Sequence, residues 1–174
     1  MLRLQLQLGD ITSARVDAIV NSTDSTLLHG GPVHEAVHRV AGPSLKVECR
    51  AIGGCDEGAA VITSGHGLTA SHVIHTVAPT WQGGGHYERE TLAHCYWSSL
   101  TLAAERGIHS LAFPSIGSGL QPQIPLEEAA PIAIQTILNF LDQHEKPERV
   151  VMVLFDAPTF VIHQKILKER LPDD

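Results

Sequence analysis

The sequence predicts an α/β fold, a three-layer α/β/α sandwich around a central mixed, mostly parallel sheet. Apolar segments with the length of strands alternate with longer segments that have helical periodicity along the 174 residues. Several of the strand segments are apolar throughout, which is typical of a sheet that is covered on both faces. The chain shows no repeat, low-complexity tract or linker, so we expect one domain over residues 1–174.

The expected elements follow one another with short connections. Strands are predicted at residues 2–8, 17–21, 59–63, 72–78, 109–114 and 150–155, and helices at residues 32–41, 43–51, 88–106, 126–143 and 158–170. The first strand alternates apolar and polar residues, which indicates a half-buried strand near a sheet edge. Pro32 and Pro43 each suit the first turn of a helix, and Gly107 suits the end of one. Glu88 is expected as a first-turn acid that the helix dipole favours.

The composition limits the classes of function. The chain has 12 basic and 19 acidic residues and a net charge of −7, which argues against broad electrostatic capture of nucleic acid. Cys49, Cys55 and Cys95 fit no zinc-finger spacing, and we expect Cys49 and Cys95 to be core thiols in a reducing compartment. No segment is typical of a signal peptide or of a membrane span, so we expect a cytoplasmic protein, with a nuclear location left open. We also expect the protein to be a monomer.

Two loops that contain glycine predict a binding site. Residues 29–33 (His-Gly-Gly-Pro-Val) follow a strand that ends at Asn21, and residues 115–119 (Ser-Ile-Gly-Ser-Gly) follow another apolar strand. Such loops can present backbone N–H groups to phosphate. Because the carboxyl ends of parallel strands meet at one edge of a sheet, we expect both loops and Phe155 to line one cleft. Asp10, in a Gly-Asp-Ile-Thr segment, adds a carboxylate that can accept a hydrogen bond from an adenine amino group.

Six segments in this order resemble the macrodomain family. They are residues 9–12, 16–21, 36–43, 73–77, 113–119 and 153–156, and together they span nearly the whole chain. The front half is more similar to MacroD-type hydrolases, whereas residues 58–61 with 65–68, and residues 113–119, resemble the macrodomain of the macro-histone variants. The resemblance implies a three-layer domain that binds ADP-ribose, either free or as a terminal modification of a mono-ADP-ribosylated protein.

The resemblance also implies a role for individual residues. Asp10 and the N–H group of Ile11 would face adenine, and Phe155 would stack on the base. Asn21 would reach the hydroxyls of the distal ribose. The first loop would line this ribose and its phosphate through Gly30, Gly31 and Val33. The second loop would hold the diphosphate through its backbone N–H groups, and its contact residues would be Ser115, Gly117, Ser118, Gly119, Leu120 and Gln121.

The chain departs from the MacroD-type pattern at the positions implicated in catalysis. The second Asn of the polar turn is replaced by Asp24, and the Asp after the glycine loop is replaced by His34. Pro32 removes one N–H donor from the loop, and Gln121 replaces an aromatic residue. Two interpretations stay open. The protein is either a reader of ADP-ribose with little or no turnover, or a hydrolase of mono-ADP-ribosyl-protein or O-acetyl-ADP-ribose. In the hydrolase, Asp24 holds a hydroxyl or water and His34 is the general base.

Four weaker alternatives also follow from the residues. His34 and His38 share a helix face and could join a zinc site, but no cysteine lies in this loop, and we predict neither a metal nor a cofactor. Ser115 and Ser118 lie outside any Gly-x-Ser-x-Gly nucleophile motif and are expected to be loop donors. Residues 81–87 form either a lid over the site or a plain surface loop. A scaffold that has lost its ligand is a third function.

Overall fold

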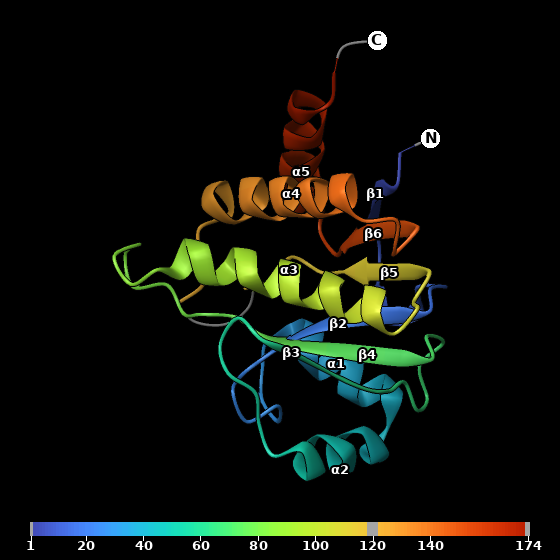
Figure 1. Ribbon diagram of the computed structural model, residues 1–174. Helices are drawn as coiled ribbons and strands as arrows, with labels where there is room; N and C mark the ends of the chain where they lie inside the picture. The colour runs from blue at the N-terminus through green and yellow to red at the C-terminus, as the bar shows by residue number, and fades with distance from the viewer. Residues whose placement is uncertain (1, 118–121, 173–174) are drawn as a thin grey trace.

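A mixed sheet forms the centre of the molecule (Figure 1). The structure is a computed structural model that describes residues 2–117 and 122–172, and within these residues six strands pair in the order β1-β6-β5-β2-β4-β3. The strands are β1 (Leu4–Leu8), β2 (Ala18–Thr23), β3 (Ala60–Ser64), β4 (His72–Val77), β5 (Ser110–Phe113) and β6 (Arg149–Leu154). Every pair of neighbours is parallel except β3 and β4, which are antiparallel.

Helices cover both faces of the sheet, which confirms the predicted three-layer α/β/α architecture (Figure 1). One face carries α1 (Pro32–Ala41) and α2 (Pro43–Ile52), together with a short 3₁₀-helix η1 (Ile11–Ser13). The other face carries α3 (Glu88–Glu105), α4 (Leu126–Gln143) and α5 (Ala157–Arg170).

The predicted element boundaries are confirmed to within two residues throughout the described part of the chain. Pro32 and Pro43 are the first residues of α1 and α2, where a missing N–H group leaves no helical hydrogen bond unmade. Cys49 and Cys95 are fully buried, as predicted for core thiols. Among the described residues, no helix is both long and apolar enough to cross a membrane.

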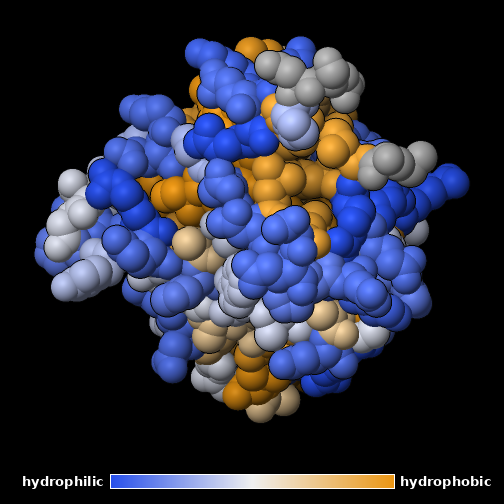
Figure 2. Space-filling view, turned by 45° about the horizontal axis from the view of Figure 1, so that its top comes forward, coloured by the Kyte–Doolittle hydropathy of each residue, from blue (hydrophilic) through white to orange (hydrophobic). Residues whose placement is uncertain are grey.

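Each face of the sheet has its own hydrophobic core, because side chains alternate along the strands. On β2, Ala18 and Val20 pack toward α3 and α4, while Ile19 packs toward α1 and α2. Asn21 follows on the α1 side and is fully buried there. The face seen in Figure 2 is mostly hydrophilic, with apolar side chains gathered in its upper part and at its lower edge. The unusual feature of this core is therefore a polar group, the side-chain amide of Asn21, which is buried beneath α1.

Candidate functional site

The carboxyl ends of the parallel strands open into one cleft. A cavity of about 280 Å³ lies there, and its lining residues are Gly9, Asp10, Ile11, Pro32, Val33, Ala36, Pro114, Ser115, Val153, Leu154, Phe155 and Thr159. A second cavity of about 180 Å³ shares five of these residues, which are Pro32, Val33, Ser115, Phe155 and Thr159. The two cavities are therefore parts of one elongated cleft, as a ligand with several linked groups requires.

The two glycine loops meet across this cleft. Val33, from the first loop, and Ser115, from the second, both line the two cavities. The backbone N–H of Gly117 donates to Oγ of Ser22 at 3.4 Å, which ties the second loop to the end of β2. Gly117 has a φ of +89°, a left-handed conformation that favours glycine. The remaining predicted contacts, Ser118, Gly119, Leu120 and Gln121, lie outside the described residues.

Three residues that line the cavity of about 280 Å³ supply a carboxylate, an N–H group and an aromatic ring. Oδ1 of Asp10 accepts hydrogen bonds from the N–H and the Oγ1–H of Thr12 at 2.9 and 2.8 Å, so Asp10 caps η1. Ile11 begins η1, and an N–H group at that position has no acceptor within its own helix. Phe155 follows β6 and is 62% exposed although it is aromatic. This combination suits a flat base with polar edges.

The first glycine loop lies directly on a buried histidine. A Cβ atom at Gly30 would stand 2.5 Å from Cβ of His34, 2.8 Å from its Cγ and 3.1 Å from the carbonyl oxygen of Ser22. Gly31 is the N-cap residue of α1, so the N-terminus of this helix faces the cleft beside Val33. Only a residue without a side chain allows the loop to approach His34 this closely.

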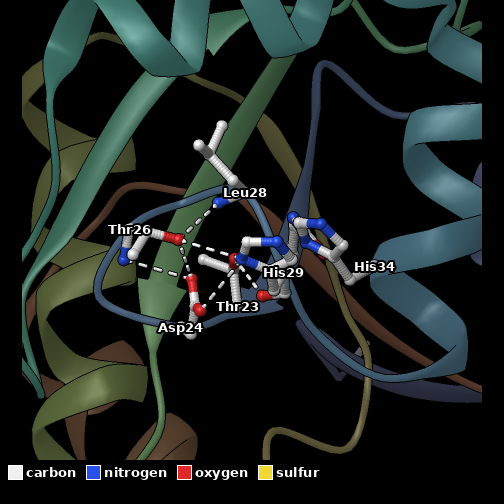
Figure 3. Close-up of polar contacts among 7 residues, drawn as sticks. Thr23, Asp24, Thr26, Leu28, His29 and His34 are labelled. Atoms are coloured by element: carbon white, nitrogen blue, oxygen red, sulfur yellow. Dashed lines mark hydrogen bonds and ion pairs between the residues drawn. The ribbon is translucent and has the colours of Figure 1, made fainter.

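Asp24 is engaged with its own turn (Figure 3). Its Oδ1 accepts from the N–H of Thr26 at 3.1 Å and from the Oγ1–H of Thr26 at 2.6 Å, and its Oδ2 lies 3.5 Å from Nδ1 of His29. Partial burial raises the pKa of Asp24, but these hydrogen bonds lower it more, and the net shift is downward. The carboxylate is turned toward Thr26 and His29, and no hydrogen bond joins it to His34 within the described part of the chain.

His34 is 2% exposed and is held by two contacts. Its Nδ1 lies 3.1 Å from Nδ2 of Asn21, which donates to it. The ring also interacts with the backbone of Leu28. Burial lowers the pKa of His34, and the contact with Leu28 only partly offsets this effect, so the ring is neutral at pH 7. A base in this position has its lone pair already engaged by an amide N–H group.

A chain of buried hydrogen bonds continues from Asn21 to β3. Nδ2 of Asn21 lies 3.2 Å from Nδ1 of His75, and Nε2 of His75 lies 2.9 Å from Oγ1 of Thr63. Asn21 and His75 are paired in register on β2 and β4, and both are fully buried. No role was predicted for His75 from the sequence. The signal was a histidine that directly follows two apolar residues in a predicted strand, but its partners are distant in sequence.

The histidines of α1 form no metal site in the described residues. The rings of His34 and His38 are 4.3 Å apart between centroids, and burial lowers the pKa of His38 to about 4. No group of three His, Cys, Asp or Glu side chains is arranged to hold a metal ion in the part of the chain that the structure describes. His34 and His38 therefore pack as neutral rings against one another.

Residues 81–87 form a loop with a defined conformation. Glu88 lies in the first turn of α3, as predicted, but it is 2% exposed, and its carboxylate accepts hydrogen bonds from three backbone N–H groups of this loop. Arg89 pairs with Glu128 through two hydrogen bonds of 2.7 and 2.9 Å, and its guanidinium lies 5.2 Å from the ring of Trp81. These contacts anchor the loop to α3 and α4. A role as a lid stays a prediction.

Comparison with known proteins agrees with the family resemblance found in the sequence. The sequence model of the Macro domain family matches residues 20–133. The chain is 47% identical over 164 residues to the O-acetyl-ADP-ribose deacetylase of Klebsiella pneumoniae, which covers 92% of this chain and 93% of that relative. It is 45% identical over 170 residues to the ADP-ribose glycohydrolase MACROD2 of Xenopus laevis, which covers 95% of this chain and 40% of that relative. The solved Oceanobacillus iheyensis macrodomain with ADP has a TM-score of 0.90 at 37% identity, and the match covers 95% of this chain and 90% of that one.

Proposed function

This chain belongs to the macro domain family, and from that premise we propose that it binds ADP-ribose, either free or as the terminal mono-ADP-ribosyl group of a protein. The observation that carries the proposal is the convergence of Asp10, Phe155 and both glycine loops on one elongated cleft. In this arrangement adenine lies against Phe155 with its amino group toward Asp10. The second loop holds the diphosphate, and the first loop takes the distal ribose.

We propose further that the protein is a reader with little or no turnover. Two contacts support this choice: Asp24 is held by Thr26, and the Nδ1 lone pair of His34 is held by Asn21. A general base needs a free lone pair within reach of its proton. Hydrolysis of mono-ADP-ribosyl-protein or O-acetyl-ADP-ribose is the second candidate, because relatives that match most of this chain are named for related activities.

The reader is proposed to act as a monomer, with residues 1–174 as one domain. The first and last strands of the described chain are neighbours in one sheet, which supports a single folding unit. Three free cysteines, two of them buried, suit a reducing intracellular compartment such as the cytoplasm. Titration calorimetry with ADP-ribose tests the proposal directly. Saturable binding is expected, and no heat at millimolar ligand would contradict it.

Asp10→Ala is expected to weaken ADP-ribose binding and also to lower the free energy of unfolding by about 1 kcal/mol, because the side chain caps η1. Asp10→Ser separates the two effects, since serine keeps an oxygen that can cap the helix but has no carboxylate for adenine. We expect Asp10→Ser to lose affinity at nearly wild-type stability, measured by calorimetry and by urea unfolding. Wild-type affinity in Asp10→Ser would limit Asp10 to a capping role.

The reader proposal predicts no turnover that depends on His34. Wild type and His34→Ala are incubated with an automodified ADP-ribosyltransferase and, separately, with O-acetyl-ADP-ribose, and product is measured over time. Both proteins are expected to stay at background. A well-placed general base contributes on the order of 10²–10⁴ in rate, so a wild-type rate that disappears in His34→Ala would establish the hydrolase instead. The double variant Asp24→Asn, His34→Asp restores the MacroD-type residues and serves as the positive control.

A further inference from the structure

We infer that His75 is a positioning residue for the first glycine loop and acts on it through the buried hydrogen-bonded chain His75–Asn21–His34. The inference rests on the proposed function, because it assigns His75 a part in holding the distal ribose end of ADP-ribose. His75 itself is fully buried on β4 and does not line either cavity of the cleft. Its influence therefore has to pass through its neighbours.

The amide of Asn21 determines the protonation of both rings. Its Nδ2 lies 3.1 Å from Nδ1 of His34 and 3.2 Å from Nδ1 of His75. An amide nitrogen carries two N–H groups, so one is available for each ring. Each Nδ1 then accepts, and each neutral ring carries its hydrogen on Nε2. At the far end, Oγ1 of Thr63 donates to the carbonyl of Ser64 at 3.1 Å, which leaves its lone pairs free to accept from Nε2–H of His75.

Among the described residues, the two Nδ1 atoms are the groups that set the orientation of this amide. Oδ1 of Asn21 is buried and has no hydrogen-bond partner among residues 2–117 and 122–172. Rotation of the amide by half a turn would point Oδ1 at the lone pairs of both Nδ1 atoms, which is unfavourable while neither Nδ1 carries a hydrogen. The acceptor atom of His75 therefore keeps Nδ2 directed toward His34. Without it, one buried N–H group of Asn21 has no acceptor.

His34 in turn supports the loop. The backbone of Gly30 packs against Cβ and Cγ of His34, and the ring interacts with the backbone of Leu28. Between these two residues, the carbonyl of His29 accepts from Oγ1 of Thr23 at 2.9 Å. The base of the loop thus lies on the imidazole of His34. If the imidazole of His34 loses the hydrogen bond from Asn21 or changes its tautomer, the ring moves, and the first glycine loop moves with it.

Three substitutions of His75 distinguish the contribution of its Nδ1 contact from that of its Nε2 contact. His75→Asn places an amide near the position of Nδ1 and keeps an acceptor for Asn21. His75→Gln places its amide near the position of Nε2 and keeps only the contact with Thr63. His75→Leu removes both. We expect the affinity for ADP-ribose to fall by about tenfold in His75→Gln and His75→Leu, and to stay within about threefold of wild type in His75→Asn.

ADP is the matched ligand, because it has the adenosine and the diphosphate but no distal ribose. His75→Gln and His75→Leu are expected to lose less affinity for ADP than for ADP-ribose, and binding of ADP also shows that all three variants are folded. Thr76→Val is the matched protein control. Thr76 is a buried threonine on the same strand, and its hydroxyl donates to the carbonyl of Ala59 at 2.8 Å, outside the chain of His75. Its loss is expected to lower stability and to leave both affinities unchanged.

The outcomes are distinct. ADP-ribose affinities that are equal in wild type and in all three His75 variants would overturn the inference, and so would equal losses for ADP and ADP-ribose. If wild type binds neither ligand, the proposed function fails, and the hydrogen-bonded chain is then judged from the ¹⁵N shifts of the histidine rings at pH 7. Nε2–H tautomers for both His34 and His75 would support the chain. An Nδ1–H tautomer in either ring would overturn it.

Discussion

Gly30→Ala is expected to reduce the affinity for ADP-ribose by about a hundredfold, as forced overpacking of a dense site predicts. The added Cβ would stand 2.5 Å from Cβ of His34 and 3.1 Å from the carbonyl oxygen of Ser22, and neither neighbour is the free end of a flexible side chain. The first glycine loop must therefore move away from α1, and its backbone no longer has the position that the ligand requires. Calorimetry with ADP-ribose measures the loss.

Gly85→Ala is the control for this prediction. A Cβ at Gly85 would meet no atom within 4 Å, and the residue lies in the loop before α3. We expect wild-type affinity and wild-type stability for this variant. Should Gly30→Ala bind ADP-ribose as tightly as wild type, the first glycine loop would have no part in the site.

Acid is expected to destabilise the protein between pH 7 and pH 5. Burial lowers the pKa of His75 to about 3 and that of His38 to about 4, while an unfolded histidine titrates near 6.5. Below about pH 6.5 the unfolded chain therefore binds more protons than the folded one, and the free energy of unfolding decreases as the pH falls. For His75 alone the expected loss at pH 5 is about 2 kcal/mol. Urea unfolding at pH 7, 6 and 5 measures it.

The contribution of His75 is isolated by comparison with an exposed histidine on the same strand. His75→Gln removes the buried titrating group, so its stability should depend less steeply on pH than that of wild type. His72→Gln, at the exposed start of β4, is the matched histidine-to-glutamine substitution measured alongside it. Identical pH dependence in wild type and His75→Gln would show that His75 titrates in the folded protein much as it does in the unfolded one.

The fold could be predicted because its signals are local. Pro32 and Pro43 mark the first turns of two helices, and the apolar strands are short and bounded by turn residues. The meeting of the two glycine loops was also predictable, because parallel strands bring their carboxyl ends to one edge.

The depth of the site residues could not be predicted, since it depends on contacts between distant segments. Asn21 and His34 occupy motif positions that suggest ligand contact, yet both are buried under the first loop. The partner of Asn21 on β4 is His75, 54 residues away in sequence. The sequence spacing shows neither this pairing nor the close packing of Gly30 on His34. The direct ligand contacts expected of Asn21 and His34 stay predictions.

The pairing of β1 with β6 has a consequence for biosynthesis. Leu4 is in register with Val150, and the N–H of Gly9 donates to the carbonyl of Leu154 at 2.9 Å. During translation β1 emerges early and has no neighbouring strand until β6 has left the ribosome. Asp10 and Phe155, which both line the cleft, come from these two segments. The cleft is therefore incomplete in a nascent chain that lacks β6. We expect nucleotide binding only after β1 and β6 have paired, which is slow because these strands are far apart in sequence.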